Sequence, residues 1–127
     1  MTDFRYLLDT NICIYILGGT NELLRARLFG QRAGTLAASA ISFAEVMRGI
    51  AGDDGPTEAS ARRLFDTVAV LPFDDAAALA YRALPFKRAR FDRLIAAHAL
   101  ALNLTLVTND TDDFADIPGL SLENWTQ

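Results

Sequence analysis

The chain has 127 residues, of which 51% are apolar, and its formal net charge at pH 7 is −4. This length suffices for one domain with a hydrophobic core and is too short for two. No run approaches the roughly 20 apolar residues of a membrane span, and the start shows no pattern of a signal peptide. The single cysteine, Cys13, excludes an internal disulfide and a cysteine zinc cluster. We expect one cytoplasmic domain over residues 1–127, with no membrane partner.

In chain order, short apolar runs alternate with helical patterns, which is typical of βαβ units around a mostly parallel sheet. The first half predicts a strand at residues 5–8, helices at 11–17 and 21–31, a strand at 35–39, a helix at 42–50 and a turn at 52–56. The second half predicts a helix at 58–67, a strand at 68–73, a helix capped by Asp74 or Asp75 and ending near 84, a helix at 91–103, a strand at 105–107 and a short edge strand at 120–122. The expected fold class is α/β, with a central sheet of four to five strands.

Three of these helices carry their apolar residues on one face, which predicts the side that each buries. The predicted inward residues are Leu23, Leu24, Leu28 and Phe29 in the helix at 21–31, Ala61, Leu64 and Phe65 in the helix at 58–67, and Leu94, Ile95, Ala99 and Leu102 in the helix at 91–103.

Four carboxylates stand where such a fold gathers ligands, namely outside the carboxyl ends of the strands. Asp9 directly follows the first strand, and Asp110 follows the strand at 105–107 by three positions. Glu45 lies on the first turn after the second strand, and Asp92 opens the helix at 91–103. Because clustered acids repel one another and Mg²⁺ and Mn²⁺ prefer oxygen ligands, the group predicts a divalent-metal site.

Each acid also has a purely structural interpretation. Asp9 and Asp92 are suitable helix N-caps, and residues 42–45 (SFAE) match a capping box in which Glu45 bonds back to the backbone of Ser42. Asp110 lies in an acid-rich turn that could be a solvated Asx-turn. His98 is expected to be a core or helix-face residue rather than a catalyst.

Charge gives a mixed indication about nucleic acid. A net negative chain argues against a phosphate-binding surface. Acids that hold a cation would count as neutralised, however, and the basic residues are concentrated in one segment. Five of them fall within twelve positions: Arg82, Lys87, Arg88, Arg90 and Arg93.

Several segments resemble PIN-domain nucleases, and VapC-type toxins in particular. They are residues 7–12 (LLDTNI), 42–46 (SFAEV), 91–99 (FDRLIAAHA), 106–110 (LVTND) with Asp113-Phe114 after it, and 122–125 (LENW). The resemblance spans nearly the whole chain in the family's order. It implies a three-layer α/β/α PIN domain over residues 1–127.

The resemblance also implies roles for individual residues. It assigns Asp9, Glu45, Asp92 and Asp110 as the catalytic, metal-binding acids, with Asp113 a substitute for or helper to Asp110. It assigns Asn11, Thr108 and Ser42 to orienting these acids. The segment 84–90 is shorter and more basic than in many relatives, and we expect the RNA contacts there and just after it, at Lys87, Arg88, Arg90 and Arg93.

The implied activity is a Mg²⁺- or Mn²⁺-dependent endoribonuclease, with one or two ions per site, that cleaves structured RNA (tRNA or rRNA) and so inhibits translation and growth. The implied partner is a VapB-type antitoxin that inserts an Arg or Lys into the acidic pocket. A homodimer and toxin–antitoxin hetero-oligomers are expected as well. The alternative is a catalytically silent PIN-like interaction domain. A phosphatase of the haloacid-dehalogenase type is disfavoured because Asn11 stands where that family has its second Asp.

Overall fold

A five-stranded sheet forms the centre of the molecule. The structure, a computed structural model, describes residues 3–88 and 90–127. The strands are β1 (Tyr6–Leu8), β2 (Leu36–Ser39), β3 (Ala69–Leu71), β4 (Thr105–Val107) and β5 (Leu122–Glu123). Their order across the sheet is β3-β2-β1-β4-β5, and every neighbouring pair is parallel. The predicted parallel α/β sheet is confirmed, and the edge strand lies two residues later than predicted at its start.

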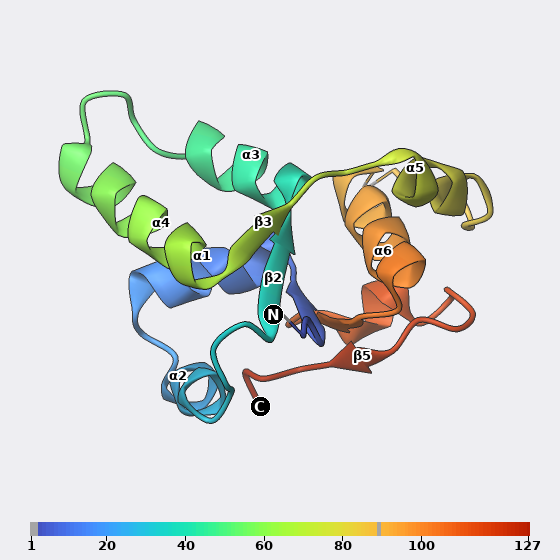
Figure 1. The fold of residues 1–127 in the computed structure, drawn as a ribbon, viewed down its shortest axis with the longest axis horizontal. Helices are drawn as coiled ribbons and strands as arrows, with labels where there is room; N and C mark the ends of the chain where they lie inside the picture. The colour runs from blue at the N-terminus through green and yellow to red at the C-terminus, as the bar shows by residue number, and fades with distance from the viewer. Residues whose placement is uncertain (1–2, 89) are drawn as a thin grey trace.

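Helices cover both faces of this sheet, which confirms the three-layer arrangement (Figure 1). One face carries the helices of the first half of the chain, α1 (Thr10–Gly18), α2 (Glu22–Phe29), α3 (Ala40–Arg48) and α4 (Gly55–Thr67). The other face carries α5 (Asp75–Arg82) and α6 (Arg90–Leu102), and a 3-10 turn η1 (Thr111–Phe114) follows β4. Across residues 3–88 and 90–127, no helix has the length and apolar character needed to cross a bilayer.

The three central strands, β1, β2 and β4, are largely buried on both faces, as parallel strands between two helical layers should be, whereas the edge strands β3 and β5 are half-buried. Successive strand residues point to opposite sides, so Leu8 and Val107 pack with α1, α3 and α4, whereas Leu7 and Leu106 pack with α6. These four side chains are fully buried. The two cores fix the sheet between its helical layers and hold the strand ends in place.

The start of α3 differs from the prediction. Ser39, the last residue of β2, is the N-cap, and its Oγ accepts from the amide of Ile41 at 3.1 Å. Ser42 therefore lies inside the helix, and the predicted capping box between Ser42 and Glu45 is wrong. The physical reason is that the chain turns from strand to helix without an intervening loop, so the cap falls on the strand's own last serine.

The start of α4 and some helix faces also differ. α4 begins at Gly55, within the predicted turn, because Asp54 caps it. Pro56 is tolerated in the first turn of the helix, where its missing N–H is not needed. Leu23, Phe29 and Leu102 are exposed, so their predicted burial is wrong. Apolar periodicity identified the correct general face but not how far the neighbouring elements cover its flanks.

The chain order creates one crevice at the carboxyl ends of the strands. From β1 the chain runs to β2 and β3 on one side, and it then returns to β4 and β5 on the other. Connections therefore diverge on either side of β1, and ligands of open α/β sheets bind at such a switch point. The residues that follow β1 and β4 lie at its mouth.

Candidate active site

Asp9 is the most deeply buried acid at this crevice, with only 5% of its surface exposed. It caps α1, because its Oδ1 accepts from the amide of Ile12 at 2.9 Å. Burial raises the pKa of Asp9 to about 6; hydrogen bonds from Thr108 and Ile12 oppose the rise, and repulsion from Asp92 and Glu45 adds to it. Asp9 therefore does cap α1, but its hydrogen bonds do not offset the cost of burying its charge close to the charges of Asp92 and Glu45.

Glu45 is held by a hydroxyl pair that joins α1 to α3. The hydroxyl of Thr10 donates to Oε1 of Glu45 at 2.6 Å, and it lies 3.2 Å from the hydroxyl of Ser42. Ser42 and Thr10 are both buried. Ser42 therefore reaches Glu45 through Thr10, a residue that sequence reasoning had not singled out.

Asp92 lies within the first turn of α6 rather than at its cap, so the N-cap interpretation does not apply to it. Burial raises the pKa of Asp92, and repulsion from Glu45, Asp113 and Asp110 adds to the rise, while the charge of Arg93 opposes it. The charge of Asp92 in turn helps to raise the pKa of Asp9, so Asp92 links the buried acid to the others.

Asp110 and Asp113 form a pair at the outer side of this cluster. Asp110 caps η1 by accepting from the amide of Asp113 at 3.3 Å, and its own amide donates to the buried hydroxyl of Thr108. A hydrogen bond to Asp110, together with the repulsion between the two, raises the pKa of Asp113. Both acids are exposed and both repel Asp92, so the structure places the two alternatives for the fourth acid in one group.

Arg93 does not face solvent, which corrects its expected role in RNA contact. Its side chain is 2% exposed, and its Nη2 donates at 2.9 Å to both the carbonyl of Asp113 and Oδ1 of Asp116. Lys87 donates to the same carbonyl at 3.3 Å. Burial of Arg93 is possible because these oxygens, 20 or more residues away, receive its charge. Arg93 ties η1 to the first turn of α6 beside Asp92.

The donor chemistry of the cluster fits a hard divalent cation. Within the described ranges no ion pair joins Asp9, Glu45 or Asp92 to a basic side chain, and the charge of Arg93 only partly opposes the repulsion at Asp92. A cation with oxygen preference relieves it. Among the described residues, no three acidic, imidazole or thiol groups lie close enough together to hold a metal ion, so binding would require the side chains to move.

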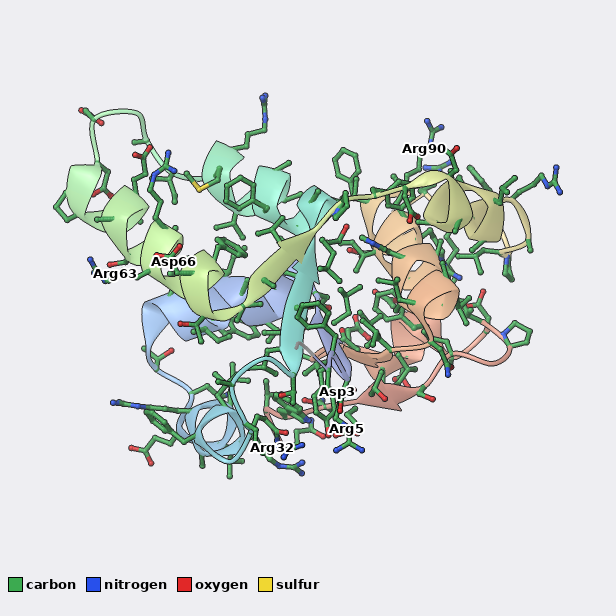
Figure 2. All side chains as sticks on the ribbon, viewed as in Figure 1. Asp3, Arg5, Arg32, Arg63, Asp66 and Arg90 are labelled. Carbon is green, nitrogen blue, oxygen red and sulfur yellow. The ribbon has the colours of Figure 1, made fainter. Side chains whose placement is uncertain are left out.

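A cleft of about 830 Å³ opens directly beside two of the acids. Glu45 and Asp92 line it together with Phe86, Arg88, Arg90 and Phe91. Arg90 lies at the carboxyl end of the sheet, whereas Arg5 and Arg32 lie at the opposite end (Figure 2). Arg88 and Arg90 are exposed, as the prediction of an RNA contact requires, and Lys87 is exposed as well.

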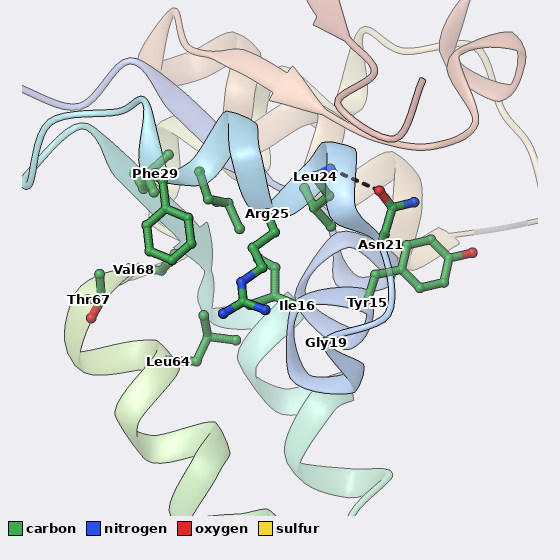
Figure 3. A pocket seen from close by; sticks show the side chains of 12 residues that line it. Tyr15, Ile16, Gly19, Asn21, Leu24, Arg25, Phe29, Leu64, Thr67 and Val68 are labelled. Atoms are coloured by element: carbon green, nitrogen blue, oxygen red, sulfur yellow. Dashed lines mark hydrogen bonds between the residues drawn. The ribbon is translucent and has the colours of Figure 1, made fainter.

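A second hollow, of about 520 Å³, lies between α1, α2 and the end of α4 (Figure 3). We call it the apolar groove; its lining includes Ile16, Leu24, Leu28, Phe29 and Leu64. No acid lines it, and its one charged residue is Arg25, whose guanidinium lies 5.7 Å from the ring of Phe29. It is therefore unsuited to bind a metal ion.

The remaining candidates behave as structural residues. His98 is buried, its Nδ1 lies 2.9 Å from Oγ of Ser39, and burial lowers its pKa, which confirms its expected place in the core. Asn11 is exposed on α1, and no hydrogen bond joins it to an acid in the part of the chain that the structure describes. Its orienting role stays a prediction. Burial raises the pKa of Cys13 to about 12, so this thiol is unreactive.

Comparison with known proteins agrees with this geometry. The PIN domain family model matches residues 6–120. The chain is 30% identical to the tRNA(fMet)-specific endonuclease VapC of Shigella flexneri, covering 96% of this chain and 98% of that protein. It is 31% identical to ribonuclease VapC2 of Rickettsia felis, covering 94% and 97% of the two chains.

Solved structures with the same fold include complexes of VapBC systems. The DNA-bound VapBC of Salmonella typhimurium matches with a TM-score of 0.84 and 27% identity, covering 97% of this chain and 99% of that one. The promoter-bound VapBC2 of Rickettsia felis matches with a TM-score of 0.82 and 28% identity, covering 96% and 99%. The chain belongs to the PIN-domain family, and within it to the VapC-type proteins.

Proposed function

We propose that this protein is the toxin of a VapBC-type toxin–antitoxin pair and a divalent-metal-dependent endoribonuclease. Asp9 carries the proposal, because a nearly buried carboxylate with a pKa near 6, repelled by Asp92 and Glu45, is unfavourable unless a cation binds it. The names of its relatives support RNA as the substrate: the protein of Shigella flexneri is a tRNA(fMet)-specific endonuclease. We extend to this chain the cleavage of a structured RNA, tRNA or rRNA, in the cytoplasm.

Some residues of the proposed site bind the metal ion, and others hold those residues in position. Asp9 and Asp92 are the proposed direct ligands of Mg²⁺ or Mn²⁺, and Glu45 with the Asp110–Asp113 pair completes the acidic set. A bound ion of this kind lowers the pKa of a water and offsets phosphate charge. Thr10 fixes Oε1 of Glu45, which leaves Oε2 to accept a proton from the attacking water. Thr108 orients Asp9 through its hydroxyl.

The proposed partner is a VapB-type antitoxin. The solved relatives from Salmonella typhimurium and Rickettsia felis are VapBC complexes. The acidic cleft would accept an Arg or Lys from such a partner. The apolar groove would accept its apolar segment, because two of the aromatic side chains that line it are exposed, Phe29 at 79% and Tyr15 at 38%. We also expect homodimers and toxin–antitoxin hetero-oligomers.

The activity is tested with a matched pair of variants, Asp9→Asn and Asp66→Asn. Asp66 is an exposed acid on α4, away from Arg90 and the cleft, so its substitution controls for loss of a charge (Figure 2). RNA 5′ ends are mapped soon after induction in cells that express each protein. We expect growth arrest and new 5′ ends for the wild type and Asp66→Asn, and neither for Asp9→Asn. Equal toxicity of all three would support the catalytically silent interaction domain instead.

The partner is tested by co-expression with the product of the open reading frame adjacent to the gene. We expect that product to restore growth and to co-purify with the toxin. Phe29→Asp places a charge in the groove without disturbing the core, so affinity for the partner should fall by roughly 30-fold or more, as for a lost interface anchor. RNA cleavage by the free toxin should not change. An unchanged complex with Phe29→Asp would remove the groove from the interface.

A further inference from the structure

Four residues from the α5–α6 connection and the start of α6 form a surface that the catalytic proposal does not use. Phe86, Arg88, Arg90 and Phe91 line the cleft together with Glu45 and Asp92, and we call them the aromatic–arginine rim. Two aromatic rings and two guanidinium groups thus share one hollow with two of the acids. This combination of groups offers stacking surfaces and phosphate contacts beside the proposed site of cleavage.

The two rings are exposed to a degree that packing does not explain. Phe86 is 73% exposed and Phe91 is 57% exposed, and neither ring belongs to the two buried clusters that flank the sheet. Leaving the apolar area of these rings in water, rather than burying it, costs about 25 cal/mol per Å². Two such rings in one cleft mark a binding surface.

The arginines of the rim are available to a ligand. No ion pair engages Arg88 or Arg90 among the described residues, whereas the neighbouring Lys87 and Arg93 both pair with Asp116. The guanidinium of Arg90 lies 6.0 Å from the ring centroid of Phe86, at the outer limit of a cation–π contact. The rim therefore presents a cation and an aromatic face side by side.

We propose that the aromatic–arginine rim binds the unpaired nucleotide beside the scissile phosphate, with its base stacked on Phe86 or Phe91 and a flanking phosphate on Arg88 or Arg90. Base faces are hidden within an A-form duplex and are available only in loops, bulges and single strands. Stacking on aromatic side chains combined with basic contacts to the backbone is the usual way in which proteins hold such RNA. The inference rests on the proposed function and restricts its substrate to RNA with an unpaired nucleotide at the cut.

The acids of the cleft favour RNA over an apolar peptide as the occupant. A hollow that is lined by both carboxylates and arginines suits a ligand that carries phosphate and, at the acids, a cation. The apolar groove has no acid in its lining, and Arg25 is its one charged residue. The rim and the groove thus suit different kinds of partner.

The test measures binding separately from cleavage, in the full chain with Asp9→Asn. The probes are a synthetic RNA hairpin that carries 2-aminopurine in its loop and a blunt duplex of the same stem. We expect tighter binding of the hairpin than of the duplex, with quenching of the 2-aminopurine emission. Phe86→Ala and Phe91→Ala are each made in this background, and Leu79→Ala, which truncates an exposed apolar side chain on α5 that lines neither the cleft nor the apolar groove, is the control.

We expect hairpin affinity to fall about 10-fold for the stacking ring and further for the double variant, with no change for Leu79→Ala. Tryptophan at the stacking position should restore binding and quenching, whereas leucine, which is apolar but cannot stack, should restore neither. Equal affinity for hairpin and duplex, or wild-type hairpin binding by the double variant, would overturn the proposal.

Light scattering of the same variants, alone and mixed with the antitoxin, tests two other occupants of the aromatic–arginine rim, namely a second copy of the chain and the antitoxin. A change of particle mass in the double phenylalanine variant would assign the rim to a contact between copies of the chain and overturn the proposal. Loss of the antitoxin complex with hairpin binding unchanged would assign it to the antitoxin. If Asp9→Asn still cuts RNA, the proposed metal site fails, while the stacking experiment still decides the inference on its own.

Discussion

The acidic cleft at the carboxyl ends of β1 and β4 and the apolar groove between α1, α2 and α4 are built from opposite materials. Glu45 and Asp92 line the cleft, and burial raises the pKa of Asp92 and of Asp9, both of which Glu45 also repels. In the apolar groove, the lining residue Leu24 is buried, whereas the lining residue Phe29 is exposed. The first region stores electrostatic repulsion, and the second leaves apolar surface exposed.

The difference teaches how each hollow relates to stability. Removing a carboxylate from the cleft should relieve repulsion and stabilise the fold at the expense of chemistry. Removing an apolar side chain from the groove floor should create a cavity and destabilise the fold while sparing the chemistry. The two regions should therefore respond to mutation with opposite signs.

The largest expected effect is on the groove side. Leu24→Ala removes a side chain that is 1% exposed and lies in the core cluster with Ile12 and Phe65. The free energy of unfolding should fall by about 2 to 5 kcal/mol. Chemical denaturation measures this loss, and the cleavage rate of the remaining folded protein should be that of the wild type. A proportional fall in both quantities would mean that the groove and the cleft are not independent.

The next effect has the opposite sign and depends on pH. Because the pKa of Asp9 is raised from 3.8 to about 6 in the folded protein, the fold binds the protonated carboxyl better than the ionised one. The associated stability is present below pH 3.8 and is lost as the pH rises through 6. In EDTA at pH 8, the free energy of unfolding of Asp9→Asn should therefore exceed that of the wild type by about 2 to 3 kcal/mol. The two should converge near pH 4, and a variant that is less stable at pH 8 would contradict the account.

A smaller effect is expected from the hydroxyl that holds Glu45. Thr10→Val keeps the shape of the side chain but removes the donor to Oε1. Loss of such an orienting contact typically lowers activity by about 10- to 100-fold. Thr20→Val, at an exposed position after α1, serves as the control. A kinetic comparison on one RNA substrate checks this, and equal rates would show that Thr10 has only a packing role.

Much of this architecture could be predicted from the sequence because its signals are local. Alternating short apolar runs predicted the strands, and Asp9, Glu45, Asp92 and Asp110 follow strands or open helices, where a parallel sheet brings such residues together. The position of Ser42 inside α3 could not be predicted, because the cap that sets the start of this helix is decided by a single hydrogen bond at Ser39. The start of α6 likewise lies one residue before its predicted bound, which places Asp92 inside the first turn.

Other features depend on contacts between distant segments. Arg93 was expected to face RNA, yet the carbonyl of Asp113 and the carboxylate of Asp116 allow it to be buried. Thr10 had no distinguishing signal until α1 and α3 were side by side. Phe86 and Phe91 looked like ordinary apolar residues, and only their exposure beside two acids shows them as a surface.

The central claim is that the acidic cluster is completed by a divalent cation, and the most direct test is the free energy of unfolding at pH 8 with and without Mn²⁺. A ligand of the folded state at 100 times its Kd adds about 2.7 kcal/mol. We predict a gain of this order for the wild type and for Asp66→Asn, and none for Asp92→Asn. An equal gain in all three proteins, or no gain in the wild type at any Mn²⁺ concentration, would contradict the account.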